Sequence, residues 1–162
     1  MSIESLHPVV RTWFERRFGS PTEAQARSWP AISEGHHTLL AAPTGSGKTL
    51  AAFLISLDAL VRQALSHDGL ADGTQVVYVS PLKALANDVR RNLIEPLEEI
   101  TQLACDMGIP VPEIRVAVRS GDTSAKERLN HLKRPPHILI TTPESLFILL
   151  TSERGRSGLK AT

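Results

Sequence analysis

The eight residues from Ala42 to Thr49 constrain the fold more than any other part of the chain. They read Ala42-Pro43-Thr44-Gly45-Ser46-Gly47-Lys48-Thr49. An apolar segment, 38–41, precedes them, and a stretch with helical apolar spacing, 50–65, follows them. Strand, glycine-rich loop and helix in this order form a P-loop, in which backbone N–H groups and the helix dipole attract phosphate. We therefore predict a nucleoside triphosphate site here, although Ala42 stands where the usual pattern has glycine.

Lys48 and Thr49 carry the chemistry of this loop. The Lys48 ammonium would reach the β- and γ-phosphates and is the candidate catalytic residue, whereas the Thr49 hydroxyl would ligate Mg²⁺. All of residues 42–49 are candidate nucleotide-binding residues, with ATP as the expected cofactor. A turn of small residues that merely precedes a helix is the alternative, and the two flanking elements argue against it.

Composition narrows the class of protein. The chain has 162 residues, about one domain, and a net charge of only +1, so no overall field favours a polyanion. Cys105 is the single cysteine, which excludes an intrachain disulfide, and we expect its thiol to be buried. No apolar run approaches the ~20 residues of a membrane span, and the first residues lack a signal-peptide pattern. We expect a soluble, cytoplasmic protein with no membrane partner and no structural metal.

Alternating apolar segments predict the fold class. Short apolar runs indicate strands at 38–41, 76–79, 114–118 and 137–141. Longer segments indicate helices at 3–18, 22–33 (bent or interrupted at Pro30), 50–65, 82–105 (kinked at Pro96), 125–132 and 144–150. Strands spaced by helices predict a doubly wound α/β domain with a parallel sheet. The basic pairs Arg90-Arg91, Lys126 with Arg128, and Lys133-Arg134 are expected to lie on solvated faces.

Gln25 has two interpretations that the sequence leaves open. Its amide carries a donor and an acceptor side by side, which match N6 and N7 of adenine, so it is a candidate base reader next to the P-loop. However, Thr22-x-x-Gln25 also has the spacing of a capping box, in which the glutamine side chain turns back to the start of its own helix.

Three further turns each follow an expected strand. They are Ser80-Pro81 with Lys83, Ser120-Gly121-Asp122-Thr123, and Thr141-Thr142-Pro143. Because parallel strands end at one edge of a sheet, such turns can build a track for phosphates. Helix capping is the alternative at all three: Ser80 as N-cap, and capping boxes at Ser124-x-x-Glu127 and Thr141-x-x-Glu144.

The ordered set of motifs resembles a known family. The motifs are Phe-x-x-Pro-Thr-x-x-Gln at 18–25, Ala-x-x-Gly-x-Gly-Lys-Thr at 42–49, Ser-Pro-Leu-Lys-Ala-Leu-Ala at 80–86, Ser-Gly-Asp-Thr at 120–123 and Thr-Thr-Pro-Glu-Ser-Leu at 141–146. Together they resemble the first RecA-like domain of superfamily-two helicases, most closely the large helicase-related (Lhr) proteins. The resemblance covers essentially the whole chain.

This resemblance implies roles for individual residues. Gln25 would read adenine, while Gly45, Gly47, Lys48 and Thr49 would hold the triphosphate and Mg²⁺. The residues that would face the backbone of single-stranded nucleic acid, DNA rather than RNA, are Pro81, Lys83, Gly121, Thr142 and Pro143. The resemblance further implies N-terminal helices with the adenine-recognition motif over 1–35, a partial RecA-like ATP-binding domain over 36–162, a second RecA-like lobe as partner, and a helicase linked to DNA repair.

One part of the helicase pattern is missing from the sequence. The family carries an Asp-Glu-x-His or Asp-Glu-x-Asp motif whose carboxylates hold Mg²⁺ and act on the attacking water, and this chain contains no Asp-Glu pair. We therefore expect an N-terminal fragment, truncated before the Walker B strand, that binds ATP without hydrolysing it. A non-enzymatic ATP- or nucleic-acid-binding module, and another P-loop NTPase such as a small-molecule kinase, are the alternatives.

Overall fold

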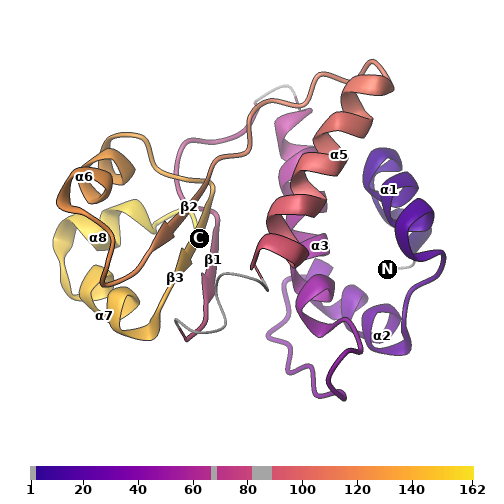
Figure 1. Ribbon diagram of the computed structural model, residues 1–162, viewed down its shortest axis with the longest axis horizontal. Coiled ribbons are helices and arrows are strands. Elements are labelled where there is room, and N and C mark those ends of the chain that lie inside the picture. Colours follow the sequence, from indigo (N-terminus) through magenta and orange to yellow (C-terminus); the bar gives the residue numbers. More distant parts are fainter. Residues whose placement is uncertain (1–2, 67–68, 82–88) are drawn as a thin grey trace. The chain divides into compact units, whose positions relative to one another are not determined.

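The computed structural model describes residues 3–66, 69–81 and 89–162. These residues form two compact units. One contains the described residues of 1–69 and 87–112, and the other those of 70–86 and 113–162. Figure 1 shows that the first unit is helical and that the second carries the sheet. We call them the helical unit and the sheet unit, and each is described by itself.

Where the structure describes the helical unit, it contains four α-helices. They are α1 (Pro8–Phe18), α2 (Glu23–Ser33), α3 (Lys48–Ala64) and α5 (Glu95–Asp106). A 3-10 turn, Ile3–Ser5, precedes α1, and a π-helical turn, Arg90–Ile94, leads into α5. Helix α1 packs against α5, and α2 packs against α3. None of the helices in the described segments is long and apolar enough to cross a membrane.

An aromatic cluster forms the core of the helical unit. Phe14 of α1 and Trp29 of α2 are fully buried, and their rings meet edge to face with centroids 5.4 Å apart. Leu54 and Leu57 of α3 and Ile100 of α5 are also buried. These residues recur at helical spacing, so each helix turns one apolar face inward. The cluster thereby joins α2, which carries Gln25, to the helix that follows the P-loop.

Proline explains where the helices differ from expectation. The predicted helix at 3–18 is split, and α1 begins at Pro8, where the missing N–H of proline costs no hydrogen bond. Pro96 also lies in the first turn of α5, directly after the π-helical turn. Of the bend or interruption predicted at Pro30, the interruption does not occur, because α2 runs through this residue. The carbonyl deprived of a partner belongs to exposed Ala26, where water can replace the bond. Residues 82–88 of the expected helix lie outside the described residues.

The described residues of the sheet unit form three parallel strands and three helices. The strands β1 (Val76–Val79), β2 (Val116–Arg119) and β3 (Ile138–Thr141) lie in the order β1-β3-β2. All residues of the central strand β3 are buried, as its continuous apolar run predicts. Helices α6 (Ala125–Lys133), α7 (Pro143–Thr151) and α8 (Glu153–Gly158) lie together beside the sheet in Figure 1. The predicted α/β class with a parallel sheet is confirmed.

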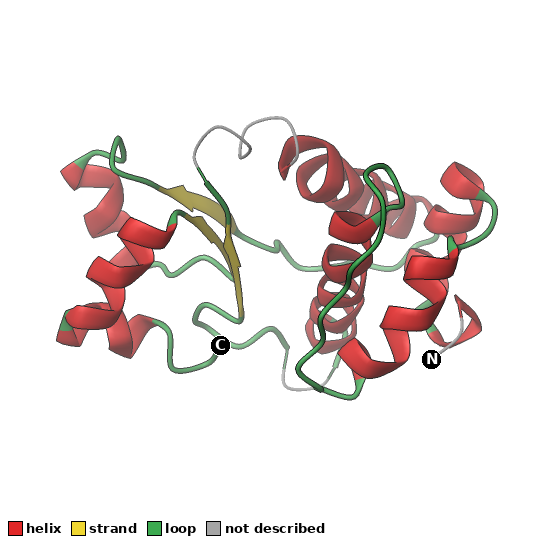
Figure 2. Cartoon of the chain, turned by 90° about the horizontal axis from the view of Figure 1, so that it is seen from below, coloured by secondary structure: helices red, strands yellow, loops and turns green. Residues whose placement is uncertain are grey.

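The strand predicted at 38–41 does not form. Figure 2 shows the segment before α3 as loop, and no residue of 38–41 is paired within the described sheet. Leu39 is 95% exposed. A strand exists only with a hydrogen-bonded neighbour, so apolar composition alone could not secure it. Cys105 is exposed, so the expectation of a buried thiol was wrong. Helix α8 was not among the helices predicted from the sequence.

Candidate nucleotide site and strand-end turns

The helix that follows the P-loop has no side-chain cap at its N-terminus. Helix α3 begins at Lys48, and its N-cap is Gly47, with a φ of 80° and no side-chain hydrogen bond to the helix. Gly45 also has a positive φ, 82°. These left-handed conformations suit glycine and explain both glycines of the motif. The first turn of α3 therefore presents N–H groups and the positive end of a 17-residue helix.

The Lys48 side chain turns back over the loop. Its ammonium donates to the carbonyl oxygen of Ala42 at 2.6 Å and to that of Pro43 at 2.7 Å. Both acceptors are neutral, so an anionic phosphate oxygen would compete well for the same ammonium. The loop is further held by Thr22, whose hydroxyl donates to the Ser46 carbonyl at 2.9 Å. Ala42, Pro43 and Ser46 were predicted to bind nucleotide. Here their carbonyl oxygens accept the hydrogen bonds that hold the loop.

Gln25 occupies the position that links the cap of α2 to the P-loop. The capping box is present: the Thr22 N–H donates to Gln25 Oε1 at 3.0 Å, and the Gln25 N–H donates to Thr22 Oγ1 at 3.3 Å. Gln25 Nε2 points to the Gly47 carbonyl at 3.5 Å. An amide oxygen has two lone pairs and an amide nitrogen two protons, so the cap leaves hydrogen-bonding capacity on both atoms. Capping and base reading are therefore compatible at this residue.

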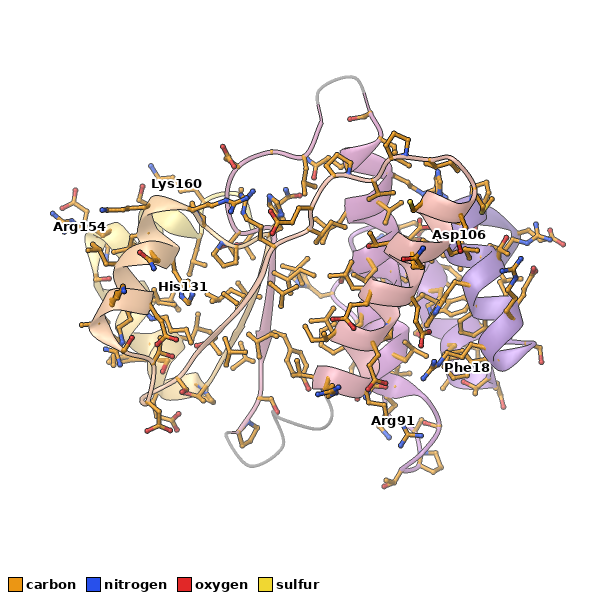
Figure 3. All side chains as sticks on the ribbon, turned by 45° about the horizontal axis from the view of Figure 1, so that its top comes forward. Phe18, Arg91, Asp106, His131, Arg154 and Lys160 are labelled. Carbon is orange, nitrogen blue, oxygen red and sulfur yellow. The ribbon has the colours of Figure 1, made fainter. Side chains whose placement is uncertain are left out.

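A cavity of about 660 Å³ lies beside the P-loop. Three of its lining residues are cationic (Arg17, Lys48 and Arg91), and none of the described residues that line it is acidic. The other lining residues are Phe18, Ser20, Thr22, Gln25, Thr44, Gly45, Gly47, Thr49, Leu50 and Asn92. Figure 3 labels Phe18 and Arg91, which come from distant parts of the sequence. Ala42, Pro43 and Ser46 instead line a second cavity of about 560 Å³, on the side of α2.

Glu99 of α5 fixes one wall of the cavity beside the P-loop. Its carboxylate accepts from Trp13 Nε1 at 2.6 Å and from Arg17 Nη1 at 2.5 Å. The Arg17 guanidinium lies 5.9 Å from the centre of the Phe18 ring, within cation–π range. This arrangement holds Arg17 and Phe18 at the end of α1, where both line the cavity.

The strand-end turns meet at one edge of the sheet. Thr141 of β3 pairs with Val79 of β1 on one side and with Arg119 of β2 on the other, so the three strands end side by side. The Thr141 hydroxyl donates to the Arg119 carbonyl at 2.8 Å and ties two of the ends together. Pro81 follows β1 and is exposed, whereas Lys83 lies outside the described residues. Gly121 is exposed in the turn after β2.

Helix capping accounts for several hydroxyl groups in these turns. Ser124 and Glu127 form the predicted capping box of α6. The box expected at Thr141-x-x-Glu144 was wrong by one residue. The N-cap of α7 is Thr142, which accepts from the Ser145 N–H at 3.3 Å because Pro143 fills the first helical position. Thr142 is buried, whereas Pro143 is exposed.

Charge distinguishes the turn after β2 from the turn after β3. At α7, hydrogen bonds from the backbone N–H of Glu144 and from the Thr142 side chain lower the pKa of the Glu144 carboxyl, so a carboxylate occupies that helix start. At the turn after β2, burial lowers the pKa of Arg119, and the charge of nearby Arg128 lowers it further. The turn after β2 is thus flanked by two guanidinium groups, those of Arg119 and Arg128.

Several of these residues could not be found by sequence reasoning. From the sequence, Arg91 and Arg128 were expected only in solvated basic clusters. In the structure, Arg91 lines the cavity beside the P-loop, and Arg128 binds the turn after β2. Arg17 and Glu99 are 82 residues apart. Only the packing of α1 on α5 brings them together, and no spacing rule signals it.

Comparison with known proteins identifies the family. The sequence model of the DEAD/DEAH box helicase family matches residues 22–162. A relative from Mycolicibacterium smegmatis, described as Lhr helicase/probable uracil glycosylase, is 57% identical over 144 residues, covering 89% of this chain and 9% of the relative. The ATP-dependent helicase Lhr-Core protein 2 of Thermococcus barophilus is 51% identical over 158 residues, covering 97% of this chain and 18% of the relative. The chain thus spans less than a fifth of either relative.

A solved structure agrees with the sequence comparison. The structure of Mycobacterium smegmatis helicase Lhr bound to ssDNA and AMP-PNP superposes with a TM-score of 0.86 and 51% identity, over 99% of this chain and 20% of that one. The likeness therefore extends to sequence and fold alike. The chain belongs to the DEAD/DEAH box helicase family, with the RecA-like fold of that family and the Lhr helicases among its homologues.

Proposed function

We propose that this chain is the nucleotide-binding and nucleic-acid-binding part of an Lhr-type helicase. In this proposal residues 42–49 and Gln25 bind ATP, and the turns that end the strands bind the backbone of single-stranded DNA. The N-terminal helices 1–35 contribute the base reader and 36–162 the ATP-binding domain. The complete motor would include a second RecA-like lobe.

The observation that carries the proposal is the uncapped start of α3 beside a cationic cavity. The N–H groups of its first turn and the Lys48 ammonium together suit a triphosphate, whose negative charges need donors and cations. Gln25 lies at the same cavity, with its amide next to Gly47, and so could select the base. The homologous Lhr structure was determined with AMP-PNP, which supports a nucleotide at this site.

Thr49 is the proposed Mg²⁺ ligand. Mg²⁺ prefers oxygen donors, and Thr49 carries a hydroxyl at the start of α3 on the lining of the cavity. Phosphate oxygens of the nucleotide would supply further ligands. The metal neutralises phosphate charge when bound; Lys48 holds the phosphates, and Gln25 orients the base.

The nucleic-acid part of the proposal depends on the sheet edge. The ends of β1, β3 and β2 are in register, which brings exposed Pro81, Gly121 and Pro143 and buried Thr142 to one edge. Backbone N–H groups and hydroxyls are common donors to phosphate oxygens and carry no sequence preference. The homologous Lhr structure was determined with bound ssDNA, which favours DNA over RNA as the ligand proposed here.

Titration of the chain with Mg-AMP-PNP tests the nucleotide site. Lys48→Ala should weaken binding by about ten- to a hundredfold, the value of a hydrogen bond from a charged donor. Lys160→Ala, which removes the same charge from an exposed position, should leave the affinity unchanged. Equal affinities of the wild type and Lys48→Ala would refute the proposed site.

We further propose that this chain by itself does not hydrolyse ATP. Phosphoryl transfer needs a group that orients the attacking water, and none of the described residues that line the cavity carries a carboxylate. Purified chain with Mg-ATP and an oligothymidylate should release no more phosphate than buffer does. Steady-state release that disappears in Lys48→Ala would contradict this proposal.

A further inference from the structure

Arg128 of α6 gathers the carbonyl oxygens of the turn after β2. Its Nε donates to the Thr123 carbonyl at 2.9 Å, and its Nη2 donates to the Gly121 carbonyl at 3.0 Å and to the Ser120 carbonyl at 3.5 Å. Three acceptors from four consecutive residues thus face one guanidinium. A planar group with donors at fixed angles holds such a set more rigidly than an ammonium can.

The same turn uses almost all of its N–H groups internally. The Ser120 N–H donates to Thr123 Oγ1 at 2.9 Å, the Asp122 N–H to Ser120 Oγ at 3.3 Å, the Thr123 N–H to the Ser120 carbonyl at 3.3 Å, and the Ser124 N–H to Glu127 at 2.9 Å. Within the described part of the chain, the N–H of Gly121 alone among residues 120–124 has no acceptor. Gly121 is exposed, and no other residue lies within 4 Å of where its Cβ would be.

Peptide geometry links these two observations. The Ser120 carbonyl and the Gly121 N–H belong to one planar trans peptide, so they point in opposite directions. When Arg128 and the Thr123 N–H hold the Ser120 oxygen, they also turn the Gly121 N–H away from the guanidinium. The guanidinium therefore sets the direction of the one backbone N–H without an acceptor among described residues 120–124.

We propose that Arg128 is a positioning residue for nucleic-acid binding: by holding the carbonyl oxygens of residues 120, 121 and 123, it presents the Gly121 N–H to a phosphate of the bound strand. This inference rests on the proposed function, in which Gly121 contacts the strand. Arg128 itself does not touch the phosphate. Its effect passes through the orientation of the backbone.

The experiment measures binding of a fluorescent oligothymidylate by anisotropy at several salt concentrations. Arg128→Met should weaken binding by about tenfold, the value of one hydrogen bond to a charged group. Arg128→Lys, which keeps the charge but loses the planar donor set, should also bind more weakly than the wild type. Lys126→Met removes the same charge from an exposed position of the same helix and should change the affinity by less than about twofold.

The salt dependence separates positioning from direct contact. A cation that neutralises a phosphate contributes about 0.7 to the slope of log affinity against log salt on a single strand, whereas a backbone N–H releases no counterion. Arg128→Met should therefore lower the affinity without changing the slope. A slope shallower by about 0.7 would mean that Arg128 contacts a phosphate, and the proposal would be wrong.

Two controls keep the outcomes distinct. Circular dichroism should show Arg128→Met as folded as the wild type under the binding conditions, which excludes unfolding as the cause of weaker DNA binding. Nucleotide binding does not provide this control, because Arg128 lies in the sheet unit and the P-loop in the helical unit. If the wild type binds DNA and Arg128→Met binds it equally well, the role of Arg128 is refuted and the proposed function stands. If the wild type binds no DNA although it binds nucleotide, the nucleic-acid function is refuted, and the role of Arg128 with it.

Discussion

The P-loop of the helical unit and the turn after β2 in the sheet unit handle their polar groups in opposite ways. In the P-loop, the functional side chain binds the loop itself: Lys48 donates to the carbonyls of Ala42 and Pro43 and must release them to reach a phosphate. In the turn after β2, Arg128 binds the carbonyls and leaves the Gly121 N–H directed outward. The first site must rearrange to bind a ligand, whereas the second is already oriented. A cationic side chain that binds loop carbonyls can therefore either leave them to bind a phosphate, as proposed for Lys48, or stay and hold the loop in place, as proposed for Arg128.

The largest expected effect is on stability, and it tests whether Phe14 belongs to the core of the helical unit. Phe14→Ala removes a fully buried ring that packs on Trp29 and should destabilise the chain by about 3–5 kcal/mol. Phe147→Ala is the matched control, because Phe147 of α7 is 68% exposed and its removal should cost within about 0.5 kcal/mol. Urea unfolding followed by circular dichroism measures both. Similar costs for the two variants would contradict the assignment of Phe14 to the core.

The two glycines of the P-loop separate backbone strain from crowding. A Cβ on Gly47 would lie 2.5 Å from Gln25 Nε2, whereas a Cβ on Gly45 would have no neighbour within 4 Å. Both residues have a positive φ, so both alanine variants carry a strain of about 1 kcal/mol. We expect Gly47→Ala to lose more, because Gln25 must also move, and to weaken Mg-AMP-PNP binding more than Gly45→Ala. Equal nucleotide affinities of the two variants would show that the contact with Gln25 does not matter.

The two capping boxes provide a smaller and more direct comparison. Thr22→Ala and Ser124→Ala each remove an N-cap and should each cost about 1 kcal/mol in thermal or urea unfolding. Thr22 also donates to the Ser46 carbonyl, so only Thr22→Ala should weaken nucleotide binding. If Ser124→Ala weakened it equally, the loss would reflect general destabilisation rather than the link between Thr22 and the P-loop.

The smallest expected effect is a difference between the two units in the stability that each loses on acidification. Burial lowers the pKa of His7 in the helical unit and of His131 and His137 in the sheet unit below the usual 6.5, with smaller contributions from nearby arginines. Below pH 6.5 the unfolded chain then binds protons that the folded chain does not. Stability is therefore complete above this pH and is lost as the pH falls through the folded pKa values.

His137 should contribute most clearly to this pH dependence. Its Nδ1 accepts the Arg115 N–H at 3.0 Å, so protonation of Nδ1 would break that bond. Amide hydrogen exchange at about pH 8 and about pH 6, on either side of the usual histidine pKa, should show protection in β3 decreasing more than protection in α2. A larger decrease in α2 would point to His7 instead.

Sequence reasoning found those parts of the site whose geometry is local. The glycines, Lys48 and Thr49 are adjacent in the sequence, and Ser124 with Glu127 is a pattern of four residues, so spacing alone predicted a P-loop and a capping box. It failed at 38–41, where a strand requires a partner that apolar composition cannot supply. It also missed the roles of Arg91 and Arg128, since a charged residue gives no sign of which backbone atoms it will meet.

Consecutive residues were enough to predict the α/β class, the family and the glycine-rich loop that we propose binds a triphosphate, because short-range backbone preferences and motif order depend on neighbours along the chain. Which residues line the cavity and how the strand ends align follow only from the tertiary structure. It brought Glu99 to Arg17 across 82 positions and put the ends of three strands in register. Such contacts depend on how helices pack and strands pair, and hydrophobic burial sets both through the whole set of apolar residues rather than through any single motif.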